Sequence, residues 1–200
     1  MGNFVITINR DFGSLGRPIA KRLAELLGIE YYDRDIVEAT AKKLHQPVSV
    51  ISEAEERKAS GFFSMLFPLG RDTAPHQRTL FETQAAFIQE VASKQSCIIV
   101  GRCADYVLRD DPNVALVNLF VHAPMAARIR RESTRTNTTP AEAEKRIRQV
   151  DKERAAYYNF FSSKRWGDAQ AYDLCVNTDG LEISDVVQLV LRYLELRGLR

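Results

Sequence analysis

The feature that most constrains the fold is a set of short runs of consecutive apolar residues, separated by longer stretches of helical periodicity. Residues 97–100 are all apolar, residues 114–121 contain one polar side chain, and residues 4–9 read Phe-Val-Ile-Thr-Ile-Asn. Strands that are buried on both faces show this pattern, and such strands belong to parallel sheets covered by helices on either side. With shorter runs at 31–32 and 172–177, the sequence predicts a doubly wound α/β fold with about five parallel strands.

The intervals between these runs carry helix signals. Residues 17–28 and 77–94 place apolar side chains at helical spacing. Thr139–Glu142 combines an N-cap hydroxyl, a proline in the first position and an acidic third position, which is a complete helix start. We expect Ser184 to cap the last helix. No repeat or change of composition divides the chain, so we expect one domain over residues 1–200.

Composition excludes several classes of protein. Hydrophobic residues make up 45% and charged residues 27% of the chain, as in ordinary globular proteins, and a net charge of +2 does not indicate a nucleic-acid binder. The three cysteines and three histidines lack the spacing of a metal site or a disulfide framework. No apolar stretch or leader pattern indicates a membrane segment or secretion. We therefore expect no protein-bound metal, no membrane partner and a cytoplasmic location.

Charge is distributed unevenly along this nearly neutral chain. Residues 124–165 carry eleven Lys and Arg against five Asp and Glu. Most of these cations are Arg, whose planar guanidinium suits phosphate oxygens. The segment is either a solvated pair of helices held by i,i+4 charge pairs or a helical lid, around residues 125–160, that closes over a polyphosphate.

A turn with two glycines joins the first apolar run to the first helix. It reads Asp-Phe-Gly-Ser-Leu-Gly-Arg-Pro over residues 11–18, where a P-loop reads Gly-x-x-x-x-Gly-Lys-Ser/Thr. Asp11 replaces the first glycine, Arg17 replaces the lysine, and Pro18 replaces the residue whose hydroxyl contacts Mg²⁺. A strand, a tight turn and a helix N-terminus still direct backbone N–H groups toward an anion. The turn therefore indicates an anion site, with Arg17 as a source of positive charge.

Taken together, segments along nearly the whole chain resemble the cytidylate kinase-like family of P-loop nucleoside-monophosphate kinases. They are Asn9–Glu25, Tyr31–Asp33, Ile99–Arg102, Asp151–Arg154, Tyr157–Tyr158 and Tyr172–Thr178. The resemblance implies a P-loop kinase topology with a degenerate Walker A loop. It also implies an ATP-dependent phosphotransferase that moves the γ-phosphoryl group of ATP, accompanied by Mg²⁺, to a nucleoside monophosphate, with CMP as the expected acceptor.

The resemblance implies roles for individual residues as well. Five residues at the glycine turn would bind the phosphates of ATP: Arg10, Gly13, Ser14, Gly16 and Arg17. Two residues after the second and third strands would bind the acceptor: Asp33 and Arg102. Four arginines would stabilise the transferring phosphoryl group: Arg17, Arg128, Arg131 and Arg154.

Structural interpretations of some of these residues stay open. Arg10 either contacts phosphate or pairs with Asp11. Asp33 either binds the acceptor or caps a following helix, and Arg102 either binds phosphate or forms a surface ion pair. The carboxylate and guanidinium of the 151–154 segment also have the spacing of an ordinary helical ion pair.

Two further alternatives concern partners and function. The apolar segment 61–70 is either a loop packed on the core, or a flap or a contact between copies of the chain. The absent lysine and hydroxyl of the P-loop favour, as an alternative function, a regulatory protein that binds nucleotide without catalysis. A kinase of another small acceptor is a further alternative.

Overall fold

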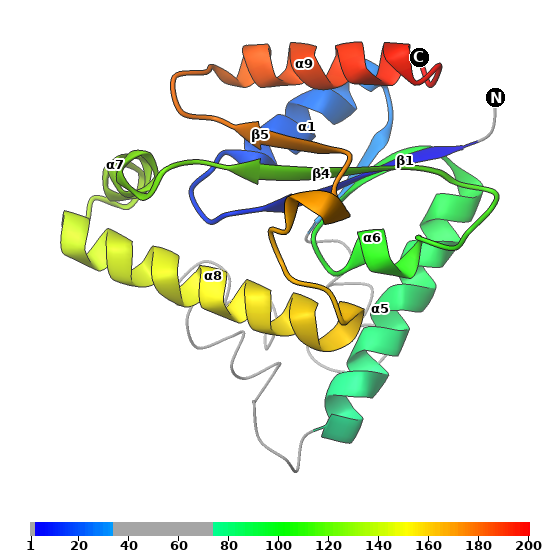
Figure 1. Cartoon of the computed structure of the whole chain (residues 1–200), viewed down its shortest axis with the longest axis horizontal. Helices are drawn as coiled ribbons and strands as arrows, with labels where there is room; N and C mark the ends of the chain where they lie inside the picture. The colour runs from blue at the N-terminus through cyan, green and yellow to red at the C-terminus, as the bar shows by residue number, and fades with distance from the viewer. Residues whose placement is uncertain (1–2, 34–73) are drawn as a thin grey trace.

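Five parallel strands form the centre of the computed structural model, which describes residues 3–33 and 74–200 (Figure 1). Their order across the sheet is β2-β3-β1-β4-β5. The prediction of a doubly wound α/β fold with about five strands is confirmed. The strands are β1 (Phe4–Arg10), β2 (Glu30–Tyr32), β3 (Cys97–Val100), β4 (Ala115–His122) and β5 (Leu174–Asn177).

Strand β1 lies at the middle of the sheet, with Val5 opposite Cys97 on β3 and opposite Leu116 on β4. Its five interior residues are buried, as its apolar composition requires. Side chains alternate between the two faces of a strand. Consecutive residues Asn9 and Arg10, at the carboxyl end of β1, therefore leave the sheet on opposite faces.

Helices cover both faces of the sheet (Figure 1). On one face, Ile19 and Leu23 of α1 and Val187 and Val190 of α9 form a core with Ile8. On the other face, α5 and α6 pack on the sheet. Beyond the carboxyl end of β4, two charged helices, α7 and α8, follow one another. The helices are α1 (Gly16–Leu27), α5 (Ala74–Lys94), α6 (Ala104–Val107), α7 (Met125–Thr136), α8 (Pro140–Ser162) and α9 (Ile183–Leu196), with a short 3₁₀ turn, η2 (Ala169–Ala171).

Two predicted helix starts had different outcomes. Thr139 caps α8 in a capping box, because its hydroxyl accepts from the Glu142 N–H while the Glu142 carboxylate accepts from the Thr139 N–H. The prediction that Ser184 caps the last helix is wrong. Glu182 is the N-cap of α9, and its backbone N–H donates to the Asp185 carboxylate at 2.9 Å. The Asp185 carboxylate thus accepts a hydrogen bond at the start of α9, where we expected a cap from the Ser184 hydroxyl.

Two other expectations concern segment 61–70 and membrane-spanning helices. Segment 61–70, the loop, flap or subunit contact, lies outside the described residues. Across 3–33 and 74–200, no helix is both long enough and apolar enough to span a bilayer.

Candidate functional site

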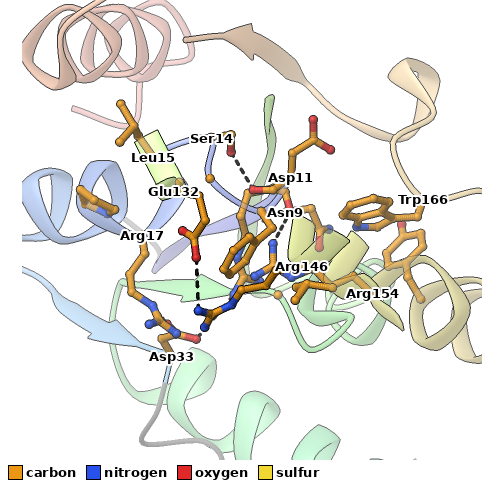
Figure 2. A pocket seen from close by; sticks show the side chains of 18 of the residues that line it. Asn9, Asp11, Ser14, Leu15, Arg17, Asp33, Glu132, Arg146, Arg154 and Trp166 are labelled. Atoms are coloured by element: carbon orange, nitrogen blue, oxygen red, sulfur yellow. Dashed lines mark hydrogen bonds and ion pairs between the residues drawn. The ribbon is translucent and has the colours of Figure 1, made fainter. Parts of the chain in front are cut away.

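A cavity of about 420 Å³ lies at the carboxyl edge of the sheet. The end of β1, the turn at 11–15, the start of α1, the residues after β2 and β3, and both charged helices contribute to its wall (Figure 2). Seven arginines and three carboxylates line it, so the wall carries an excess of positive charge. The arginines are Arg10, Arg17, Arg102, Arg131, Arg135, Arg146 and Arg154, and the carboxylates are Asp11, Asp33 and Glu132.

The turn between β1 and α1 is held by hydrogen bonds that fold it back on the sheet. The Ser14 hydroxyl lies 2.9 Å from the carbonyl oxygens of both Asp11 and Val121. The Thr178 hydroxyl donates to the Ser14 carbonyl at 3.1 Å. Gly13 and Leu15 have left-handed backbone conformations, with φ of 81° and 69°. The Ser14 backbone N–H also donates to the Asp11 carbonyl, at 3.4 Å, so both donors of this residue are engaged within the folded turn.

A group of charged residues, here called the cavity cluster (Arg10, Arg17 and Asp33), lies beside this turn. Figure 2 shows the Arg17 and Asp33 side chains directed toward each other. Arg17 Nε lies 2.5 Å from Asp33 Oδ2, and Arg10 Nη2 lies 3.8 Å from Asp33 Oδ1. Tyr31 donates its hydroxyl to Asp33 Oδ2 at 3.1 Å. Arg10 therefore pairs with Asp33 and not with Asp11, so the Asp11 pair that the sequence allowed does not form.

Electrostatics in the cavity cluster favour a bound anion. Burial alone would raise the pKa of Asp33, but Arg10, Arg17 and Arg102 outweigh burial and hold that pKa below its usual range. Burial lowers the pKa of the Arg10 guanidinium, and the charges of Arg17 and Arg102 lower it further. One carboxylate thus faces three guanidinium groups. A phosphate or another oxyanion would supply the negative charge that this group lacks.

A second charged group, here called the turn clamp (Arg128, Asp11 and Asp151), holds the turn from the opposite side. Arg128 of α7 pairs with Asp151 of α8, and its Nε lies 3.8 Å from Asp11 Oδ2. Asp151 accepts from the Phe12 N–H at 2.7 Å, while Arg128 donates to the Phe12 carbonyl at 3.3 Å. Arg128 does not line the cavity, and its guanidinium contacts the turn instead.

The remaining predicted arginines of the helix pair reach the cavity from two sides. Arg131 donates to the hydroxyl and carbonyl oxygens of Thr178, at 2.9 and 2.7 Å. Arg154 donates to the Arg10 carbonyl at 2.9 Å and does not pair with Asp151. Burial and the charge of Arg10 lower the pKa of Arg154. The cavity thus brings together the predicted donor, acceptor and helix-pair residues, apart from Arg128.

Sequence reasoning missed a buried polar group in the wall opposite Arg10. Asn9 Nδ2 donates to Asp105 Oδ1 at 3.1 Å, and the Tyr158 hydroxyl donates to Asp105 Oδ2 at 2.5 Å. Burial raises the pKa of Asp105. Tyr158 lines the cavity together with Tyr157 and Trp166, and these three side chains form an aromatic wall. An acidic residue inside the apolar stretch 103–108 was the available signal.

Magnesium, which the resemblance implies together with ATP, finds no suitable protein ligands among the described residues. Asp33 pairs with Arg10 and Arg17, Glu132 pairs with Arg135 and Arg146, and Asp11 lies in the turn clamp. Pro18 has no hydroxyl. In 3–33 and 74–200, no group of three His, Cys, Asp or Glu residues is arranged to hold a metal ion. Because Mg²⁺ prefers unpaired carboxylates and other oxygen ligands, these residues do not fit a protein-bound Mg²⁺.

Comparison with solved structures identifies the class to which this fold belongs. A shikimate kinase from Acinetobacter baumannii in complex with shikimate has a TM-score of 0.55 and 15% identity, over 99% of this chain and 96% of that one. A gluconokinase from Sinorhizobium meliloti 1021 has a TM-score of 0.52 and 16% identity, over 92% and 87% of the two chains. The fold is that of a P-loop kinase.

The sequence matches the cytidylate kinase-like family over residues 5–180, and the chain belongs to that family. A cytidylate kinase from Saccharolobus islandicus strain Y.G.57.14 is 28% identical over 110 residues, which are 53% of this chain and 54% of that protein. The match spans about half the length of this curated relative. An uncharacterized protein from Eubacterium ventriosum ATCC 27560 is 25% identical, with a TM-score of 0.71 over 96% of this chain and 99% of that one.

Proposed function

We propose that this protein is a nucleoside-monophosphate kinase that transfers the γ-phosphoryl group of ATP to CMP. The observation that carries the proposal is the gathering of Arg10, Arg17 and Arg102 around the single carboxylate of Asp33, beside the N-terminus of α1. Phosphoryl transfer needs positioning and charge neutralisation more than covalent catalysis. An arginine-rich cavity at the carboxyl edge of a parallel sheet meets that need. CMP is chosen because the curated relatives are cytidylate kinases.

The two nucleotides would take different sides of the cavity. The turn at 11–15 and Arg17 would hold the phosphates of ATP, with backbone N–H groups of Gly13 and Gly16 toward the anion. Arg102 and Asp33 would hold the monophosphate. Arg131 and Arg154 would approach from the helix pair, while Arg128 would keep the turn in place. The aromatic wall of Tyr157 and Trp166 offers a flat apolar surface to a base. Such an enzyme would act in the cytoplasm.

A coupled assay of ADP release tests this function directly. With ATP and each common nucleoside monophosphate in turn, we expect the fastest ADP release with CMP. The same ligands are compared in a thermal-shift panel. Nucleotide-dependent stabilisation without ADP release would instead support the regulatory protein that binds but does not catalyse. Release with a different acceptor only would support the third alternative.

The charged helices α7 and α8 form, in this proposal, a lid that closes over bound nucleotide. Four of the cavity-lining arginines belong to them, and Glu132, with 2% of its side chain exposed, pairs with Arg135 and Arg146. Phosphates would supply the negative charge that the remaining arginines lack. Hydrogen exchange across 125–160 should slow when ATP and CMP are both present, and identical exchange with and without nucleotide would leave a rigid, solvated helix pair.

A further inference from the structure

Arg10 lies in a passage made by two glycines. A Cβ atom on Gly16 would lie 2.7 Å from Arg10 Cβ and 2.8 Å from Arg10 Cγ. A Cβ atom on Gly101 would lie 2.3 Å from Arg10 Nη1. Gly16 thus makes room for the base of the side chain and Gly101 for its guanidinium. Only glycine at both positions lets an arginine cross from the glycine turn toward β3 in this conformation.

The guanidinium at the end of this passage has few partners. Within residues 3–33 and 74–200, its one counter-ion is Asp33 at 3.8 Å, and no hydrogen bond from this guanidinium is found. Arginine carries five N–H donors, and burying them without acceptors is unfavourable. The Arg10 side chain retains 15% of its exposure, and the residue lines the cavity. Its donors are therefore available to a ligand in that space.

Arg17, the residue at the position of the P-loop lysine, is placed differently. Its side chain is 61% exposed, and its Nε is bonded to Asp33 at 2.5 Å. Arg10 is also the residue where three parts of the site meet. Gly16 and Gly101 flank its side chain, and Arg154 of α8 donates to its carbonyl. The Arg10 side chain therefore lines the cavity between Gly16 of the turn and Gly101, the neighbour of Arg102.

We propose that Arg10 is a catalytic residue, whose guanidinium contacts the transferring phosphoryl group between the two nucleotides. The inference rests on the proposed function and assigns Arg10 a role shared by donor and acceptor, in place of a role at ATP alone. During transfer, the bond from the γ-phosphorus to the bridging oxygen breaks, and its electron pair stays on ADP. A new bond forms from an acceptor phosphate oxygen to the same phosphorus. Arg10 stays protonated and neutralises the charge on the oxygens of the transferring group.

Substitution of Arg10 tests this assignment through kcat and through the affinities for a joined analogue, for ATP and for CMP. Arg10→Met should lower kcat roughly 100- to 1,000-fold, as the loss of one donor to a developing charge does elsewhere. Calorimetry supplies a readout without turnover. The variant should bind an ATP–CMP analogue, joined through the phosphates of both nucleotides, at least tenfold more weakly, while its affinities for ATP alone and CMP alone change less. An analogue affinity equal to that of the wild type would overturn the proposal.

A glycine pair provides a matched control that retains Arg10. Gly101→Ala places a methyl group on the path of the guanidinium, whereas Gly28→Ala meets nothing within 4 Å. Both glycines have left-handed φ, 74° and 64°, so both variants carry a similar backbone penalty. Gly101→Ala should lower kcat roughly 10- to 100-fold through misplacement of Arg10, and Gly28→Ala should keep the kcat of the wild type. Equal kcat values for the two variants would contradict the role of the passage.

The two proposals fail in distinguishable ways. Absence of ADP release by the wild type with every monophosphate would overturn the proposed function, while calorimetry with the joined analogue would still decide whether Arg10 contacts the phosphates between the two nucleotides. ADP release that survives Arg10→Met at the wild-type rate would overturn the assignment of Arg10 and leave the kinase function standing. A wild type that neither releases ADP nor binds the joined analogue would overturn both.

Discussion

Two groups of arginine and aspartate residues flank the same turn, and they differ in the ratio of guanidinium to carboxylate groups. In the cavity cluster, the carboxylate of Asp33 is shared by Arg10 and Arg17. In the turn clamp, the guanidinium of Arg128 is shared by two carboxylates and also donates to the Phe12 carbonyl. The first group lacks negative charge and lines the cavity. The second has its cation enclosed and contacts the backbone.

The difference separates binding from positioning among residues of the same type. A guanidinium with one carboxylate at 3.8 Å and, among the described residues, no hydrogen bond is ready for a phosphate. Arg128 instead pairs with two carboxylates and donates to a backbone carbonyl, and it fixes the structure around it although its buried Nε has no hydrogen-bond partner within 3–33 and 74–200. Sequence alone gave Arg128 the same role as Arg131 and Arg154. Its contacts show that it holds the turn, which in the proposed function would receive the phosphates of ATP.

The largest effect that we expect is on stability, from loss of the clamp. Arg128→Met leaves Asp11 and Asp151 without their shared cation, and breaking a buried ion pair in this way costs about 3–5 kcal/mol. Urea unfolding measures the change. Arg130→Met on the same helix is the control, because Arg130 and Asp179 are 69% and 43% exposed and such pairs contribute at most about 1 kcal/mol. Similar losses of unfolding free energy in both variants would show that the turn clamp contributes no more to stability than an exposed ion pair.

The next largest effect is on the KM values of the two substrates, and it tests whether ATP and CMP bind at different sides of the cavity. Arg102→Met should raise KM for CMP more than KM for ATP, and Arg17→Met should do the reverse. Each should lose about 2–4 kcal/mol of transition-state stabilisation, by analogy with the loss of one oxyanion donor. Steady-state kinetics with each substrate varied in turn measures both. Parallel changes in the two KM values would contradict the assignment of sides.

A smaller effect distinguishes the two groups by pH. The pKa of Asp33 is lowered in the folded state, so its ionisation adds stability above about pH 4 that disappears as the pH falls through the folded-state value. Burial raises the pKa of Asp11, against the pull of Arg128. Its ionisation therefore removes stability as the pH rises from about 4 through the folded-state value.

Urea unfolding of Asp33→Asn and Asp11→Asn, compared with the wild type between pH 3 and 7, measures these opposite slopes. The stability advantage of the wild type over Asp33→Asn should grow with pH, and its advantage over Asp11→Asn should decline. Each difference changes by at most about 1.4 kcal/mol per pH unit. Slopes of the same sign would show that the two carboxylates have equivalent surroundings.

The smallest effect tests whether charge on the helix pair matters everywhere or only at the cavity. Arg148 pairs with Glu144 at 2.6 Å on the exposed side of α8. An i,i+4 pair of this kind contributes about 0.3–0.5 kcal/mol. Arg148→Ala should therefore lower the unfolding free energy by no more than that and leave ADP release unchanged. A clear loss of activity would extend the functional surface beyond the cavity.

Local signals predicted much of the fold. The apolar run at 97–100 coincides with β3, and the Thr139–Glu142 pattern forms the expected capping box. These features depend on neighbours in sequence, which a single chain displays. The glycine at 28 likewise ends α1 in a left-handed conformation. The predicted sheet followed because buried strands alternate with helices along the chain.

The contacts of the site were harder to predict, because they join distant residues. Asp151 was a candidate partner of Arg154, one turn away, but it pairs with Arg128 and with the Phe12 N–H, 139 residues away in sequence. Gly16 was predicted to bind the phosphates of ATP, and the sequence did not show that its missing Cβ also makes room for Arg10. Spacing along one helix does not show which neighbour a long side chain will reach.

The position of β1 has a consequence for synthesis on the ribosome. This strand emerges before both of its neighbours, so Val5 cannot complete its ladder until Cys97 and Leu116 have been translated. Until then, the nascent chain holds an apolar strand with two open edges, a state that invites association between chains. A chain terminated before β4 would keep Arg10 yet lack one neighbour of the strand that carries it. Productive folding of this protein therefore waits for its second half.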